Sequence, residues 1–338
     1  MAKRKYSGNR NKIQPAVQTL TFTVPASQAG VTSYIDLSQV TSLVNRRFYR
    51  QGINWAVGGF KFVGGSTGVL QISKLPNTWV MSNAWEKSMR AWLKMTRDAM
   101  EETSVRPKFL DFKIYADADH HSAGYGANLL PQNGPIYAPA GTDVYTAGEW
   151  QPSEVYTPNG PNFPGNTNNF EMIAVGANYP GIGASGLNAV SLIEGYAASR
   201  GLPNIKDPNT PDDALDADGS TPENWIGAIF NEGTDQDSEV IEDLITKNNI
   251  SPYPFENDGK HGDTMYPNGA NNVPYLQVHD FAFETGTTIG GMTRMKGGNF
   301  PCGLIKIEAV NDSDVLFLQI DLVPGSHRGY LCEPMTEM

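Results

Sequence analysis

The sequence predicts an all-β protein: a single jelly-roll β-sandwich of roughly eight core strands, with one amphipathic helix and a large acidic loop insertion. Two observations lead to this fold class. Charged residues are few (18%) while the chain holds 35 Gly and 23 Pro, a mixture that favours strands joined by ordered loops over helical bundles. Strand-like segments also gather towards the two ends of the 338-residue chain, with a long stretch of different texture between them.

The first group of expected strands begins with "VQTLTFTV" at residues 17–24, where polar and apolar residues largely alternate. Residues 53–63 and 68–75 lie on either side of "GGSTG" and predict a strand–turn–strand unit. Between these strands, residues 37–52 predict a short helical or turn segment, and residues 109–117 return to a strand pattern. These segments form the first part of the predicted sandwich.

The amphipathic helix is expected shortly after residue 80. Ser82 and Asn83 are suitable caps for its start. Trp85, Met89 and Trp92 then recur at helical spacing, which predicts a helix that packs its aromatic stripe onto a sheet.

The last expected strands are residues 275–284, 303–310 and 315–323. If both groups of strands share one core, the Pro-, Gly- and Asn-rich stretch between them is an excursion from that core. Within this stretch, residues 187–199 and 238–249 predict helices. The predicted organisation is therefore a basic N-terminal arm (1–14), the first part of the sandwich (15–116), an acidic surface insertion that could form a projection (117–274) and the C-terminal strands (275–338).

Charge is distributed unevenly along the chain. The net charge is −11, but residues 1–113 carry 17 Lys and Arg against 6 Asp and Glu, whereas residues 114–338 carry 8 against 30. Such an asymmetry predicts one surface that faces nucleic acid or a membrane and a separate surface that faces solvent. No apolar run approaches the ~18 residues of a membrane span, so no membrane insertion is expected. The alternation after residue 12 predicts a strand, not a signal peptide.

Two basic segments are candidates for binding nucleic acid. The first is the arm, whose first twelve residues hold no anion and five cations, Lys3, Arg4, Lys5, Arg10 and Lys12. Cations of this kind contact phosphates without sequence preference. The alternatives for the arm are a nuclear-localisation patch or a solubilising tail.

The second basic segment is "NRRFYRQGINW", in which Arg46, Arg47 and Arg50 surround two aromatic residues. Guanidinium groups interleaved with aromatic rings can hold phosphates and stack unpaired bases. The alternative is an amphipathic turn that buries Phe48 and pairs its arginines with acids such as Asp36.

Other motifs give weaker indications. "GIGASG" at residues 181–186 matches the dinucleotide-binding pattern but lacks the βαβ context, so a plain loop is expected. "DADHH" at residues 117–121 could bind a metal, but a solvated loop is the favoured interpretation. No catalytic motif is present, so no enzyme and no cofactor are expected, although the acidic loops could bind divalent cations adventitiously. Cys302 and Cys332 are expected to be buried thiols.

Several of these stretches resemble one family. The basic arm, "YIDLSQVTSLVNRRFYRQGINWAVGGFKFV", "ISKLPNTWVMSNAWEKSMRAW" and "PCGLIKIEAV…LFLQIDLVPGSHRGYLCEPMT" are similar to capsid proteins of circular single-stranded DNA viruses that encode a replication initiator (CRESS-DNA viruses), in particular environmental and marine members. The resemblance covers about residues 1–113 and 275–338.

The resemblance implies a single jelly roll, many copies of which close into an icosahedral shell around the genome. Its partners would be further copies of itself, the single-stranded DNA and an unidentified host receptor. Its location would be the virion, with assembly in the host cell nucleus. The arm cations would neutralise packaged DNA, and the acidic insertion would lie outside. The short arm departs from the family pattern, so further inner-face cations would have to assist it.

Two other classes of function stay open. A carbohydrate-binding or adhesion module would use exposed aromatic residues, namely Tyr125, Tyr137, Tyr145, Trp150 and Tyr156. A nucleotide-dependent enzyme would use the "GIGASG" loop and bind a dinucleotide saturably.

Overall fold

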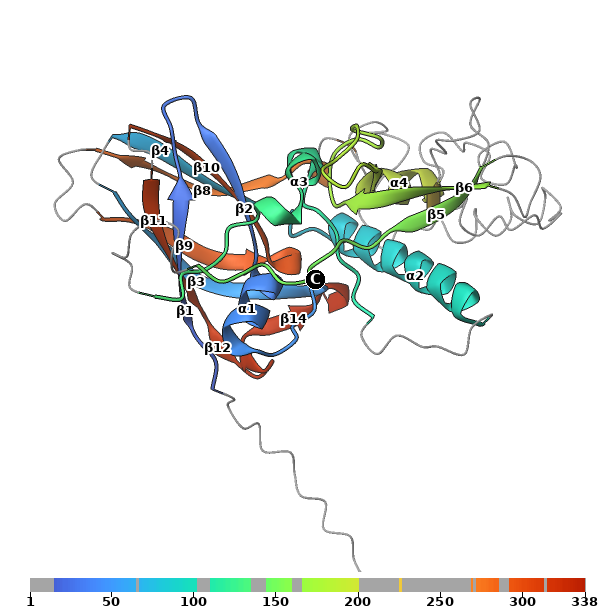
Figure 1. The fold of residues 1–338 in the computed structure, drawn as a ribbon, viewed down its shortest axis with the longest axis horizontal. Coiled ribbons are helices and arrows are strands. Elements are labelled where there is room, and N and C mark those ends of the chain that lie inside the picture. Colours follow the sequence, from blue (N-terminus) through green and yellow to red (C-terminus); the bar gives the residue numbers. More distant parts are fainter. Residues whose placement is uncertain are drawn as a thin grey trace, which may run out of the picture.

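The fold is mostly β and is built around two curled antiparallel sheets, as expected for a β-sandwich (Figure 1). It is taken from a computed structural model. The structure describes residues 15–64, 67–101, 110–134, 144–159, 166–200, 225–226, 269, 272–285, 292–312 and 315–337.

The first sheet has the order β1-β11-β3-β14, and β9 also pairs with β3. The second sheet has the order β2-β10-β4-β8. The strands of the first sheet are β1 (Thr19–Pro25), β3 (Ile53–Val63), β9 (Met292–Phe300), β11 (Val315–Leu322) and β14 (Cys332–Pro334). Those of the second are β2 (Val31–Asp36), β4 (Gly68–Lys74), β8 (Gln277–Glu284) and β10 (Leu304–Asn311).

The main core lies between these sheets. Phe22 and Val24 of β1, and Leu318 and Ile320 of β11, are each completely buried and separated by more exposed residues. A period-two pattern places every second side chain on the same face of a strand, so both strands direct their apolar side chains into one layer. The alternation at residues 17–24 therefore predicted this strand correctly.

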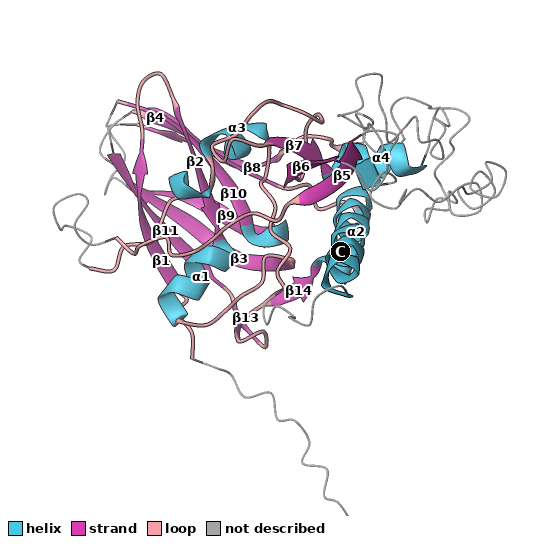
Figure 2. Ribbon diagram, turned by 45° about the vertical axis from the view of Figure 1, so that its right-hand side comes forward, coloured by secondary structure: helices cyan, strands magenta, loops and turns pink. Residues whose placement is uncertain are grey.

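Helices and a smaller sheet adjoin one end of the two large sheets (Figure 2). In the smaller sheet, β5 pairs with β6 antiparallel and β6 pairs with β7 parallel. The remaining elements are β5 (Val155–Asn159), β6 (Asn166–Ile173), β7 (Asn188–Ser191), β12 (Pro324–Gly325), β13 (Gly329–Tyr330), α1 (Leu37–Asn45), α2 (Trp79–Glu101), α3 (Ala118–Ala123), α4 (Leu192–Arg200) and 3₁₀ turns at Tyr125–Ala127, Pro301–Gly303 and Met335–Glu337.

A second hydrophobic cluster joins the smaller sheet to the sandwich. It contains Met172 of β6, Val190 of β7 and Ile193 of α4 together with Tyr34 of β2 and Leu304 of β10, all buried. The described part of the chain between residues 117 and 274 is therefore packed against the strands at both ends of the chain.

The helices differ from the prediction in number and in one boundary. Besides α2, the predicted amphipathic helix, α1 and α4 lie in segments that were expected to be helical, whereas α3 was not expected. The helix expected at residues 238–249 lies outside the described residues. Helix α2 begins at Trp79 because the Thr78 hydroxyl accepts a hydrogen bond from the Met81 amide, 3.3 Å away. Ser82, expected to cap the helix, lies inside it and donates to the Met335 carbonyl. None of the helices within the described residues is both long and apolar enough to cross a membrane.

Two other segments were assigned wrongly. Residues 109–117 form no strand where they are described; Tyr115 makes an isolated bridge with Ile173. The helix expected at residues 187–199 starts at Leu192, since residues 188–191 pair with β6 as a strand. For residues 188–191, pairing with β6 decided the structure, and the local pattern did not contain that information.

Candidate nucleic-acid interface

The predicted cationic residues fall into two groups. Lys3, Arg4, Lys5, Arg10 and Lys12 lie outside the described residues. Arg46, Arg47 and Arg50 lie in the turn that connects α1 to β3.

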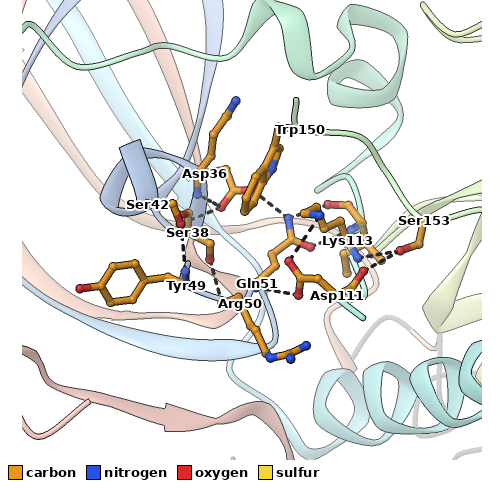
Figure 3. Close-up of polar contacts among 12 residues, drawn as sticks. Asp36, Ser38, Ser42, Tyr49, Arg50, Gln51, Asp111, Lys113, Trp150 and Ser153 are labelled. Atoms are coloured by element: carbon orange, nitrogen blue, oxygen red, sulfur yellow. Dashed lines mark hydrogen bonds and ion pairs between the residues drawn. The ribbon is translucent and has the colours of Figure 1, made fainter. Parts of the chain in front are cut away.

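Side chains of α1 hold this turn in place. The Ser38 hydroxyl donates to the Arg50 carbonyl (3.1 Å), and the Tyr49 amide donates to the Ser42 hydroxyl (3.0 Å) (Figure 3). Arg46 ends the helix in the left-handed conformation (φ 54°), which reverses the chain. The backbone of the turn is thus fixed from inside, while Arg46 and Arg50 are exposed.

A fourth arginine, Arg328, joins the group from the turn between β12 and β13. Its carbonyl accepts a hydrogen bond from the Tyr49 hydroxyl (3.0 Å), and its guanidinium donates to the Phe48 carbonyl. The Arg47 guanidinium donates to the Pro15 carbonyl (2.9 Å) and lies 3.5 Å from the Arg328 carbonyl. These contacts bring the two arginine-bearing turns together beside Pro15, the residue that follows the arm.

The arginines are not held in ion pairs, but Asp111 lies near enough for Arg50 to influence it: burial raises the pKa of Asp111, and the charge of Arg50 partly opposes that shift. Within the described parts of the chain, no carboxylate lies at ion-pair distance from Arg46, Arg47, Arg50 or Arg328. We call these four residues the arginine cluster. Sequence reasoning missed Arg328 because nothing in "GSHRGY" indicates which distant turn it contacts; its own left-handed conformation (φ 52°) marks a turn.

Asp36, proposed as an ion-pair partner of these arginines, has a different role. It is completely buried, and its carboxylate caps α1 by accepting from the Ser38 and Gln39 amides. Gln51 Nε2 (3.1 Å) and Trp150 Nε1 (3.0 Å) donate to its other oxygen (Figure 3). Burial raises the pKa of Asp36 to about 6. The ion-pair interpretation of the turn is therefore wrong for Asp36.

A cavity of about 640 Å³ lies beside the arginine cluster. Arg50 and Arg328 line it, and Figure 3 shows the Arg50 side chain directed away from the Asp36 network. The other lining residues are mostly apolar. They come from the turn between α1 and β3, from the start of β3, from α2, from residues 110–112 and from the C-terminal end: Phe48, Gly52, Ile53, Trp85, Met89, Trp92, Leu93, Leu110, Asp111, Phe112, His327, Pro334 and Thr336.

The "GIGASG" loop connects β6 to β7 and precedes a strand, not a helix. Its amides are used within the fold: Gly181 donates to the Asn188 side chain, Gly183 to the Leu187 carbonyl and Gly186 to the Gly183 carbonyl. The loop thus has the plain structural role that was expected, and these amides are not free to hold a pyrophosphate.

The "DADHH" segment forms α3 and is not a solvated loop as expected. His120 and His121 are buried; His120 Nε2 lies 2.8 Å from Asn128 Oδ1 and His121 Nε2 lies 2.9 Å from Glu171 Oε2. Asp117 caps the helix and pairs with Lys306 (3.0 Å). Across the described residues, no group of three or more His, Cys, Asp or Glu side chains is arranged to hold a metal ion.

The aromatic residues considered for carbohydrate binding do not form one exposed platform. Tyr125 is buried and donates to the Ile114 carbonyl, and Trp150 is engaged with Asp36. Tyr156 is 46% exposed, Tyr145 is half-buried, and Tyr137 lies outside the described residues.

Both cysteines are free thiols. Cys302 is buried, as expected, and Cys332 is half-buried. Burial raises the pKa of both thiols. Neither is therefore an activated nucleophile.

Comparison with known proteins adds no relative. No family model, no curated protein and no solved structure matches the chain.

The double variant R46Q/R50Q should weaken binding of a single-stranded oligonucleotide and flatten its salt dependence. Each phosphate contact on single-stranded DNA contributes about 0.7 to the slope of log K against log salt, so the loss of two contacts should reduce the slope by about 1.4. Fluorescence anisotropy at several salt concentrations measures it. The control is R90Q/R97Q, which removes the same charge from α2 outside the cavity lining. Equal slopes in both variants would contradict a role for the cluster.

Acidification should reduce stability through His120. Burial lowers the pKa of His120 to about 4, from a usual 6.5. Between these values the unfolded chain takes up a proton that the folded chain does not, so the free energy of unfolding falls as pH decreases from 6.5 to 4. In His120→Gln this contribution is absent. Urea unfolding at pH 7 and at pH 4.5 gives the free energy of unfolding of wild type and of the variant. On going from pH 7 to pH 4.5, wild type should lose on the order of 2 kcal/mol more of this free energy than the variant loses. A constant difference would contradict it.

Proposed function

We propose that this chain is the coat protein of a single-stranded DNA virus, and that many copies assemble into a closed shell around the genome. The observation that carries the proposal is the pairing of the strands. Strands β1 to β4 pair in order with β11 to β8 in reverse: β1 with β11, β2 with β10, β3 with β9 and β4 with β8, all antiparallel.

This pairing supports a jelly roll. An antiparallel ribbon folded back on itself and wound across two sheets has eight strands distributed as two sets of four. Here β1, β11, β3 and β9 fall in one sheet and β2, β10, β4 and β8 in the other. The described residues between β4 and β8 lie outside the two sheets, so the long connection occupies the bend of the ribbon. The jelly roll is the fold that the family resemblance implies.

The arginine cluster supports the packaging of nucleic acid. It adds four cations at the root of an arm that carries five. Because the arm is short, the family resemblance calls for further cations that contact the packaged DNA. The four arginines of the cluster lie beside Pro15, and we assign them this role. The acidic remainder of the chain would face outwards, although most of its charged residues lie outside the described part.

Self-assembly is supported by the edge of the second sheet. Strand β8 ends the order β2-β10-β4-β8, and it carries Val278 (50% exposed), Phe281 (58%) and Phe283 (68%). Natural proteins normally protect an edge strand from pairing and seldom leave neighbouring aromatic residues exposed beside it. A second copy of the chain would bury these side chains.

Size-exclusion chromatography of the purified protein, with absorbance read at 260 and 280 nm and electron microscopy of the void fraction, tests the proposal. We expect uniform closed particles with a nucleic-acid-rich absorbance ratio. Deletion of residues 1–12 should lower this ratio because it removes five cations. A nucleic-acid-free monomer at all salt concentrations and pH values would contradict the proposal.

The double variant F281D/F283D should prevent particle formation without unfolding the subunit. Both side chains are largely exposed, so the aspartates cost little in the isolated chain, but burying two charges between subunits is expensive. Far-UV circular dichroism checks the fold and light scattering measures assembly. The control is Ile182→Asp, which changes an even more exposed apolar side chain (74%) in the "GIGASG" loop. Particles of normal size from F281D/F283D would rule out this edge as an interface.

A further inference from the structure

The cavity beside the arginine cluster combines aromatic walls with a cationic rim. Trp85 and Trp92 of α2 each contact Phe112, with ring centroids 5.9 and 5.7 Å apart. Arg50 and Arg328 contribute exposed guanidinium groups, and the Arg50 guanidinium also lies 5.6 Å from the centre of the Phe48 ring.

The aromatic wall is fixed by close packing. The Trp85 ring lies directly against Gly52, where an added Cβ would come within 2.3 Å of Trp85 Cζ2. Gly52 follows the arginine-bearing turn, so the turn and the wall are positioned together. A ligand would therefore meet a largely preformed site.

Polar groups in the wall are left without hydrogen bonds. Trp85 is 4% exposed, yet its indole Nε1 has no hydrogen-bond partner. Asp111 Oδ2 is also buried without a hydrogen bond and lies 3.5 Å from Lys113 Nζ. Both atoms are enclosed by the surrounding protein, so the cavity offers a ligand its aromatic faces and the rim guanidinium groups instead.

We propose that this cavity holds one unpaired nucleobase of the packaged strand, while Arg50 and Arg328 bind the adjoining phosphates. A nucleobase offers a flat ring that can stack on the aromatic wall, and the phosphates beside it carry the negative charge that the guanidinium groups at the rim attract. This inference rests on the proposed function and names the way in which the same interface holds its nucleic acid.

The charge of the rim argues against the other occupants. The arm carries five cations and no anion, so the arginine cluster repels it. A purely apolar ligand would make no use of the Arg50 and Arg328 guanidinium groups at the rim. A single strand combines anionic phosphates with stacking rings, which matches both parts of the site.

The test compares two oligonucleotides of equal length and charge, a thymidine oligomer and one in which every nucleotide is abasic. The full-length protein is freed of co-purifying nucleic acid at high salt, and binding is measured by fluorescence anisotropy. We expect the abasic strand to bind about fivefold to 150-fold more weakly, since stacking of one base contributes about 1–3 kcal/mol.

The variant Trp92→Leu locates the effect, because Trp92 lines the cavity and is only partly buried. It should bring the two oligonucleotides to nearly equal affinity. Trp79→Leu, on the same helix but outside the cavity lining, should preserve the difference. Photocross-linking of a 5-iododeoxyuridine oligomer to wild-type protein, followed by peptide mass spectrometry, gives a readout that does not depend on the stability of a variant. We expect the cross-link within residues 79–97.

The outcomes separate this inference from the proposed function. Equal affinity of wild type for both strands would overturn the base site and leave the arginine cluster and the shell proposal intact. A base-dependent affinity that survives in Trp92→Leu, with cross-links elsewhere, would also overturn it. Failure of wild type to bind either strand would overturn both the base site and the packaging of nucleic acid.

Discussion

The buried carboxylate of Asp36 is the contact on which the rest of the interface depends. It lies at the junction of β2 and α1, caps the helix, and accepts hydrogen bonds from Gln51 and Trp150. Gln51 in turn exchanges hydrogen bonds with the Ile114 backbone, donating to its carbonyl and accepting from its amide. The segments around Asp36, Gln51, Ile114 and Trp150 are thus joined in one hydrogen-bond network. A buried charge is costly unless every lone pair is engaged, so this geometry leaves little freedom to the parts around it.

The interface follows from this constraint. With α1 and Gln51 held in place, the backbone of the turn between them is fixed by hydrogen bonds. In this conformation the side chains of Arg46 and Arg50 are exposed. The hydrogen bonds around Asp36 and Gln51 therefore account both for the fixed backbone of the turn and for the exposure of its guanidinium groups. The cavity has the same origin, because Gly52 directly follows Gln51 and lies against the ring of Trp85.

The sequence predicted what depends on local periodicity. The alternation in β1 and β11, the aromatic stripe of α2 and the arginine-bearing turn could be recognised because their patterns repeat within a few residues. It did not reveal Arg328 as a neighbour of Phe48, or Asp36 as a buried cap, since both depend on contacts between remote segments.

The misassigned elements have a similar explanation. Residues 188–191 form a strand because β6 offers them a partner, and the histidines of "DADHH" are buried because Asn128 and Glu171 meet them from other segments. Short segments of this kind take the structure that their neighbours impose, and propensity alone does not decide it.

The hydrogen bond between Arg47 and the Pro15 carbonyl has a consequence for the arm as a tether. It fixes the point from which residues 1–14 depart, and a chain of that length reaches at most about 50 Å even when fully extended. The five arm cations are thereby tethered to the subunit that carries the cavity, so their effective concentration near it depends on the length of the tether and not on the amount of protein in solution. A DNA strand held at one nucleotide in the cavity, as proposed, would accordingly contact the arm repeatedly before it dissociated. The cavity and the arm together would then hold the strand longer than either would alone.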